Sequence, residues 1–172
     1  MLQLNSIANV GVHRTCTPLY EKYTATPYNT FLDPSDTNNI YSGMVMYRTG
    51  ADTVALATVT GTNYANAKPF GLSALDRNPN IDDVTQVGVN AWSVWIGGSN
   101  AFFTITAPAF DTTQAYNIST SGTRQFLYTT SGTGQLTSVS GSNINGVAVA
   151  ELIDVISPTQ IVVRLVPFGA AA

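Results

Sequence analysis

The hexapeptide TVTGTN, at Thr58–Asn63, is echoed eighty positions later by SVSGSN, at Ser138–Asn143. An apolar segment that contains a tyrosine precedes each copy, Met44–Tyr47 in the first case and Phe126–Tyr128 in the second. Within each copy the glycine falls where we expect a loop, because glycine interrupts regular strand structure. The sequence therefore uses one local pattern twice.

A glycine that opens an apolar run follows each copy of the hexapeptide. These runs are Gly71–Leu75 after the first copy and Gly146–Leu152 after the second. Self-similarity of this kind indicates one small β unit that is used twice. We therefore predict two related β units, at about 43–75 and 124–152, and we interpret the repeat as a way of building the fold rather than as a duplicated active site.

Short apolar segments separated by turn residues continue through the rest of the chain. Residues 84–96 alternate with one slip of phase, which a β-bulge explains, and Gly97–Asn100 (GGSN) is typical of a hairpin loop. A helix over 146–156 is an alternative, although the β-branched residues there favour a strand. The predicted fold is all-β, a β-sandwich or barrel of short antiparallel strands. Strands are expected at 40–47, 54–60, 70–75, 84–96, 101–106, 116–120, 125–130, 134–139, 146–151 and 160–166.

The first forty residues differ in character from the rest. Prolines at positions 18, 27 and 34 interrupt both helices and inner strands, and aromatic residues lie between them. We predict an extended N-terminal arm at 1–40 before a β body at 41–172, with an irregular segment that covers its own core as the alternative. Aromatic side chains on such an arm need a surface to pack on. Those of the arm are Tyr20, Tyr23, Tyr28 and Phe31.

The composition excludes several classes of function. Charged residues make up 10% of the 172 residues, well below the usual value of about 25%, and the net charge is −3. The seven basic residues are scattered singly, so neither a nucleic-acid-binding face nor a polybasic membrane patch is expected. No apolar run approaches the ~20 residues of a membrane span, and no signal peptide is evident, so synthesis in a cytoplasm is expected.

No catalytic or metal-binding pattern is present in the sequence. His13 is the only histidine and Cys16 the only cysteine, so a disulfide within the chain is impossible and a histidine-rich metal site is excluded. The segment Asp33–Asn39 (DPSDTNN) offers oxygen atoms but lacks the glycine and distal glutamate of a calcium loop, and turn chemistry explains it equally well. We therefore predict no enzyme, no metal and no cofactor.

An aromatic group occupies two predicted neighbouring strands, with Trp92 and Trp95 on one and Phe102 and Phe103 on the other. Each pair has opposite parity, so one member points inward and one outward on a regular strand. The outward members suit a protein interface, a sugar-stacking platform or a core covered by the arm. The candidate interface residues are Tyr20, Tyr23, Tyr28, Phe31, Trp92, Trp95, Phe102 and Phe103.

Four segments carry a resemblance to a known family: Ser42–Val45, Lys68–Leu72, Asn145–Ala148 and Ser157–Leu165. With the polar, uncharged composition and the arm before a β body, they resemble the head decoration (cement) proteins of tailed bacteriophages over roughly 40–168. The resemblance implies a β-rich structural virion protein, often a homotrimer, that binds the major capsid protein on the capsid exterior and strengthens the shell. It implies no catalytic residues. An arm of about forty residues is long for the smallest members.

A carbohydrate-binding or adhesin-like β module of a tail or head fibre is the alternative function. It would use the tryptophans at 92 or 95 as stacking platforms. Glycan binding that is lost on replacing either tryptophan with alanine would favour this alternative, whereas a stable trimer in solution would favour assembly.

Overall fold

The structure is a computed structural model. It describes residues 16–18, 28–58, 69–77, 91–96, 102–118, 123–130, 132–140 and 147–166. Within these ranges the chain is all-β, as predicted, and contains eleven strands. No helix in these ranges is long and apolar enough to cross a membrane. The two hexapeptides lie mostly outside the described ranges.

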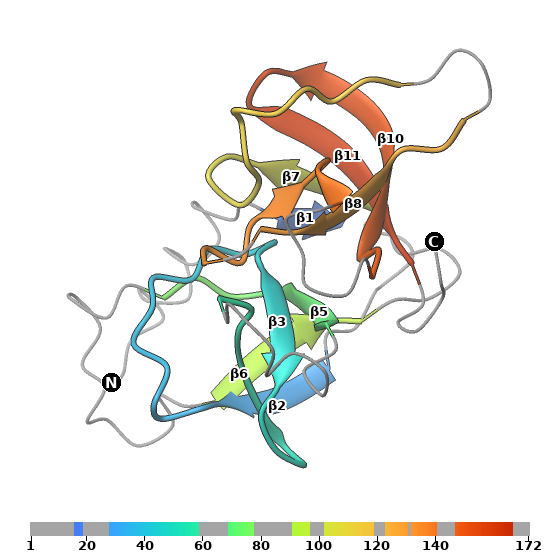
Figure 1. Ribbon diagram of the computed structural model, residues 1–172. Helices are drawn as coiled ribbons and strands as arrows, with labels where there is room; N and C mark the ends of the chain where they lie inside the picture. Colours follow the sequence, from blue (N-terminus) through green and yellow to red (C-terminus); the bar gives the residue numbers. More distant parts are fainter. Residues whose placement is uncertain are drawn as a thin grey trace, which may run out of the picture.

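The first part of the chain forms a closed barrel of five strands, which we call the N-terminal barrel (Figure 1). The strand order around it is β2-β4-β3-β5-β6, and β6 pairs with β2 to close the ring. All neighbours are antiparallel except β2 and β4, which are parallel. Its strands are β2 (Tyr28–Leu32), β3 (Val45–Arg48), β4 (Thr53–Leu56), β5 (Pro69–Ser73) and β6 (Ala91–Trp95).

The second part forms an open sheet of six strands, which we call the C-terminal sheet and which lies above the barrel in Figure 1. Its strand order is β1-β7-β11-β10-β8-β9. The hairpin of β10 and β11 forms its centre, and the helix considered for 146–156 is absent because β10 covers much of that range. The strands are β1 (Cys16–Pro18), β7 (Phe102–Thr106), β8 (Phe126–Thr129), β9 (Leu136–Thr137), β10 (Ala150–Ser157) and β11 (Gln160–Leu165).

The two halves have the same strand connectivity. Read from β4, the barrel runs β4-β3-β5-β6-β2; read from β9, the C-terminal sheet runs β9-β8-β10-β11-β7. A row of paired residues crosses three strands of the barrel, and one of the two rows that cross the corresponding strands of the C-terminal sheet is compared with it. These rows are Val45, Leu72 and Trp95 in the barrel and Phe126, Glu151 and Arg164 in the C-terminal sheet.

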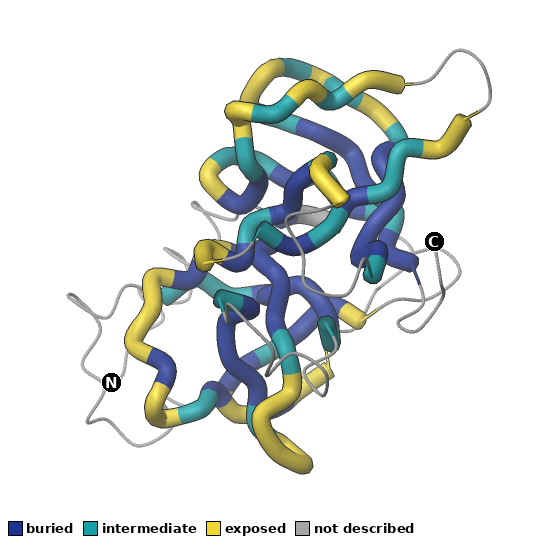
Figure 2. Tube along the Cα trace, viewed as in Figure 1, coloured by how far each residue is buried: buried dark blue, intermediate teal, exposed yellow. Residues whose placement is uncertain are grey.

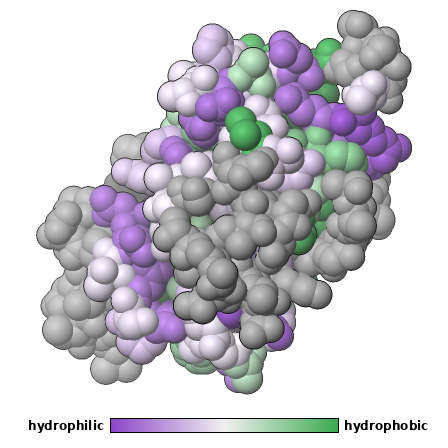
Figure 3. All heavy atoms as spheres, viewed as in Figure 1, coloured by the Kyte–Doolittle hydropathy of each residue, from purple (hydrophilic) through white to green (hydrophobic). Residues whose placement is uncertain are grey.

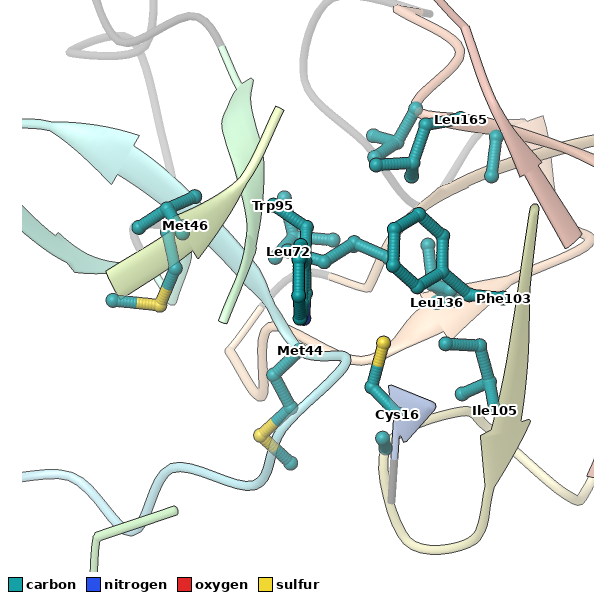
Figure 4. Packing of buried hydrophobic residues seen from close by; sticks show 14 of the residues in the cluster. Cys16, Met44, Met46, Leu72, Trp95, Phe103, Ile105, Leu136 and Leu165 are labelled. Carbon is teal, nitrogen blue, oxygen red and sulfur yellow. The ribbon is translucent and has the colours of Figure 1, made fainter. Parts of the chain in front are cut away.

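The halves share one hydrophobic core at their junction (Figure 4). Trp92 points into the barrel, and Trp95, of opposite parity, points out of it. Trp95 is nevertheless buried, because its ring packs on Phe103 of β7 with the centroids 5.2 Å apart. The row that contains Trp95 therefore faces the C-terminal sheet, whereas the row compared with it in that sheet carries the charged pair Glu151 and Arg164 beside Phe126.

Gly134 allows the halves to approach closely elsewhere along the junction. Its φ is +69°, and a Cβ atom there would lie 2.7 Å from Cδ1 of Leu56. The backbone N–H of Val45 donates a hydrogen bond to the carbonyl oxygen of Gly134 over 2.8 Å. A side chain at this position would therefore push the two halves apart.

Two strands of the body lie inside the region that the sequence suggested as an arm. In β2, Thr30 and Leu32 are buried while Phe31 between them is exposed, so the segment has the alternation of a half-buried strand. Pairing of β2 with β4 and β6 closes the barrel, and β1 pairs with β7. Residues 1–15 and 19–27 of the suggested arm lie outside the described residues.

One predicted strand does not form over its described residues. Tyr116–Ile118, part of the strand expected at 116–120, is irregular. The Tyr116 hydroxyl donates hydrogen bonds to the carbonyl oxygens of Asp111 and Leu136, at 2.8 and 3.3 Å, and its ring packs edge-on against Phe110. The tyrosine fixes this segment beside β9 through its side chain, in place of a strand ladder.

Candidate interaction surface

The aspartates of the Asp33–Asn39 segment serve the fold. Oδ1 of Asp33 accepts hydrogen bonds from the N–H and hydroxyl of Ser35, and these bonds lower the pKa of the carboxyl group. Asp36 is buried, and its Oδ2 accepts the backbone N–H of Leu56 over 2.6 Å. Within the described ranges no group of three or more potential metal ligands occurs. Both carboxylates are thus accounted for by turn and barrel structure.

Glu151 forms the charged centre of the C-terminal sheet. Glu151 is buried and lies opposite Arg164 in the β10–β11 register, and its carboxylate accepts a hydrogen bond from the Arg164 guanidinium. Arg124 approaches the other carboxylate oxygen to 3.5 Å. In the row compared with that of the barrel, the pair stands where Leu72 and Trp95 stand, and its burial depends on the mutual pairing of the two charges.

An aromatic and cationic cluster lies at one end of the N-terminal barrel, beside the turn 49–52 that joins β3 to β4. Tyr28 and Phe70 meet edge to face, with their centroids 5.5 Å apart. The guanidinium carbon of Arg48 lies 4.4 Å from the Phe70 ring centre and 5.8 Å from that of Tyr28. Three strands, β2, β3 and β5, therefore hold one arginine over two rings, an arrangement that cation–π attraction stabilises.

Phe31 lies on the outer wall of the barrel, with parity opposite to that of Tyr28 along β2. Its side chain is 54% exposed, and it pairs with Ala91, which is also exposed. Its N–H donates to the carbonyl oxygen of Asp52, which places it beside the same exposed turn (Figure 2). We call Tyr28, Phe31, Arg48 and Phe70 the aromatic surface. It offers exposed aromatic area, a positive charge and a backbone fixed by the barrel.

The structure separates the eight candidate interface residues into three groups. Tyr28 and Phe31 are exposed and belong to the aromatic surface. Trp92, Trp95 and Phe103 are buried in the core, the alternative that the sequence also allowed, and Phe102 is half-buried. Tyr20 and Tyr23 lie outside the described residues and stay predictions.

Two members of the aromatic surface, Arg48 and Phe70, were missed by the sequence reasoning. In the sequence, Arg48 lies just after the strand expected at 40–47, and Phe70 is the first residue of the strand expected at 70–75. Their partnership depends on the antiparallel register of β3 and β5, which brings the end of one strand beside the start of the other. In the sequence, a basic residue at the end of one strand and an aromatic residue after Pro69 are only weak signals. Their proximity is evident only from the β3–β5 register.

One face of the molecule illustrates the character of the described surface. On the face shown in Figure 3, hydrophilic and intermediate residues cover most of the described area, and apolar ones are scattered. Within the aromatic surface, Tyr28, Arg48 and Phe70 form one contiguous cluster on a molecule with only 10% charged residues.

No curated protein and no solved structure matched the chain. A family model described as phage cement protein matches residues 2–172, nearly the whole sequence. This match agrees with the all-β fold and with the resemblance seen in the four sequence segments. The chain therefore belongs to the phage cement protein family, a family of structural, capsid-associated proteins.

Proposed function

We propose that the protein binds the outer surface of a phage capsid and stabilises the shell, and that the aromatic surface makes the contact. The family membership supports a structural role on a capsid. Two features carry the choice of surface: the exposure of Phe31 beside the turn 49–52, and the exposure of Tyr28 under the guanidinium of Arg48.

The chemistry of the aromatic surface suits a protein partner. Aromatic residues and arginine are enriched at interfaces, where they provide most of the binding energy from few positions. The barrel fixes the backbone of Phe31 and Tyr28 before binding, which lowers the ordering cost of association. A modest contact, repeated over many copies on a lattice, adds up to stable attachment.

The assembly that we propose is a homotrimer on the capsid exterior, with the major capsid protein as partner and synthesis in the host cytoplasm. The uncharged, polar surface and the absence of a basic cluster in the sequence are consistent with a protein partner rather than nucleic acid.

Co-sedimentation with capsids that lack the protein tests the surface. Phe31→Ala and Arg48→Ala should each weaken binding about tenfold, equivalent to ~1.4 kcal/mol. Ile156→Ala, on the β10 strand of the other half, is the matched control, because Ile156 is 53% exposed and Phe31 54%. Binding that falls in the control as much as in Phe31→Ala, or that survives both barrel variants, would exclude the aromatic surface.

A second candidate function is carbohydrate binding, favoured by a groove of about 270 Å³ between the halves. The groove has an uncharged lining that includes Asn39, Tyr41 and Gln135 over Met44 and Leu56. Amides, hydroxyls and an exposed ring suit a neutral glycan. Glycan-array binding that Tyr41→Ala abolishes and Tyr28→Ala retains would support it, since the two tyrosines are 38% and 37% exposed.

A further inference from the structure

The C-terminal sheet differs from the barrel at one edge. In the barrel, β4 covers the edge of β2 through the parallel pairs Phe31–Thr53 and Leu32–Val54. In the C-terminal sheet, β9 occupies the position of β4, but it meets the chain beyond β7 at a single parallel bridge, Phe110–Leu136. Closure of the second ring therefore stops short of β7, and the edge of β7 is left for another strand.

Strand β1 fills this edge. It pairs with β7 in antiparallel register, Cys16 with Ile105 and Thr17 with Thr104. Cys16 is 1% exposed, and its N–H donates to the hydroxyl of Ser42 over 3.1 Å. The segment that completes the C-terminal sheet thus comes from the start of the chain, ahead of the barrel. The structure therefore shows the edge of β7 paired with β1.

The covalent link between β1 and the barrel is long compared with the strand itself. Residues 19–27 separate β1 from β2. A chain spans at most 3.3–3.6 Å per residue, so the ten steps from Pro18 to Tyr28 can bridge about 35 Å. Only three residues hold β1 on β7. The same β1–β7 contacts can therefore form within one chain or between two neighbours.

We propose that the edge of β7 is a strand-acceptor site that takes β1 from a second copy of this chain as well as from its own. Exchange of an identical element forms no new contact, so it costs little beyond the lost tether. A short tether supplies its own strand at an effective concentration of about 1 mM. Neighbours packed on a shell reach comparable local concentrations. The role on a shell rests on the proposed function, whereas the exchange itself does not.

Disulfide trapping between full-length chains tests the exchange in solution without any capsid. The wild-type chain is mixed with the variant Cys16→Ser/Ile105→Cys at about 1 mM each, the concentration that matches a short tether, and a mild oxidant is added. Each chain then carries one thiol, so a link between positions 16 and 105 forms only between copies. We expect this link in the peptides identified by mass spectrometry; its absence, together with the absence of a link at the neighbouring register position of Thr17 and Thr104, would overturn the proposal.

Two further mixtures control for the burial of Ile105 and for random collision between chains. Because Ile105 is fully buried, a second pair, Cys16→Ser/Thr17→Cys with Cys16→Ser/Thr104→Cys, uses the neighbouring register position, where Thr104 is half-buried. A link at either register position supports exchange. As a control, Cys16→Ser/Ile118→Cys is mixed with the wild-type chain under the same conditions. Its thiol lies at a 52% exposed site, so links between positions 16 and 118 measure random collision between chains. Links to position 118 that form as fast as those at the register positions would also overturn the proposal.

Discussion

Replacing each tryptophan with phenylalanine separates two buried indoles that differ in the partner of the ring N–H. Nε1 of Trp92 donates to the hydroxyl of Ser73 over 3.1 Å. Nε1 of Trp95 is buried at the junction without a hydrogen-bond partner in the described part of the chain. Both substitutions remove the same atoms, so most of the packing loss cancels when the two variants are compared.

The expected difference follows from these two environments. Trp92→Phe loses a hydrogen bond worth about 1 kcal/mol, whereas Trp95→Phe removes an unsatisfied donor whose burial costs roughly 1–3 kcal/mol. We therefore expect Trp92→Phe to lower the free energy of unfolding by about 2 kcal/mol more than Trp95→Phe does. Urea unfolding of both variants, followed by far-ultraviolet circular dichroism, measures this difference. Equal losses, or a larger loss for Trp95→Phe, would refute the reasoning.

Two further predictions concern the junction and a turn. Gly134→Ala should destabilise the protein more than Gly132→Ala, since both have positive φ, at about 1–2 kcal/mol for the strain, but only Gly134 faces Leu56; equal losses in urea would contradict the junction contact. The lowered pKa of Asp33 contributes stability above its usual value of 3.8, and this contribution is lost as the pH falls through the folded pKa. Ser35→Ala should therefore flatten the acid side of the stability profile, and an unchanged profile would contradict the assignment.

The sequence predicts the strand content well because strand signals are local. Alternation and turn residues located most strands of both halves, and the repeated pattern points to the strands that hold matching places, β3 with β8 and β5 with β10. The opposite parity of Trp92 and Trp95 also predicted one inward and one outward side chain. What the outward side chain contacts depends on the other half of the molecule, which no local pattern reveals.

The matching rows show why the junction escaped prediction. Leu72 and Trp95 in one half correspond to Glu151 and Arg164 in the other. An apolar pair is stable at this position when a second layer covers it, whereas the buried Glu151 is stable there because it is paired with Arg164, whose side chain is 34% exposed. The apolar pair in the barrel thus indicates that this face of the barrel is covered by the other half. This inference needs the strand registers, which the sequence alone does not supply.

Local sequence patterns were also insufficient to predict the strands near the start of the chain, β1 and β2. The prolines of this region favour an extended arm over an inner strand, yet Pro18 is the last residue of β1, where a missing N–H is tolerated. One consequence is practical, because a deletion that reaches position 35 removes β2 and opens the barrel. A test of the residues before the body must therefore stop short of Cys16.

The most direct test of the central claim is the temperature at which capsids rupture, measured with and without the unmodified protein. Capsids that lack the protein are titrated with it and heated, and release of their contents is followed by a DNA-binding dye. We expect the protein to co-sediment with the shells and to raise the rupture temperature until the sites are saturated. Saturable binding with an unchanged rupture temperature, or no binding at all, would contradict it.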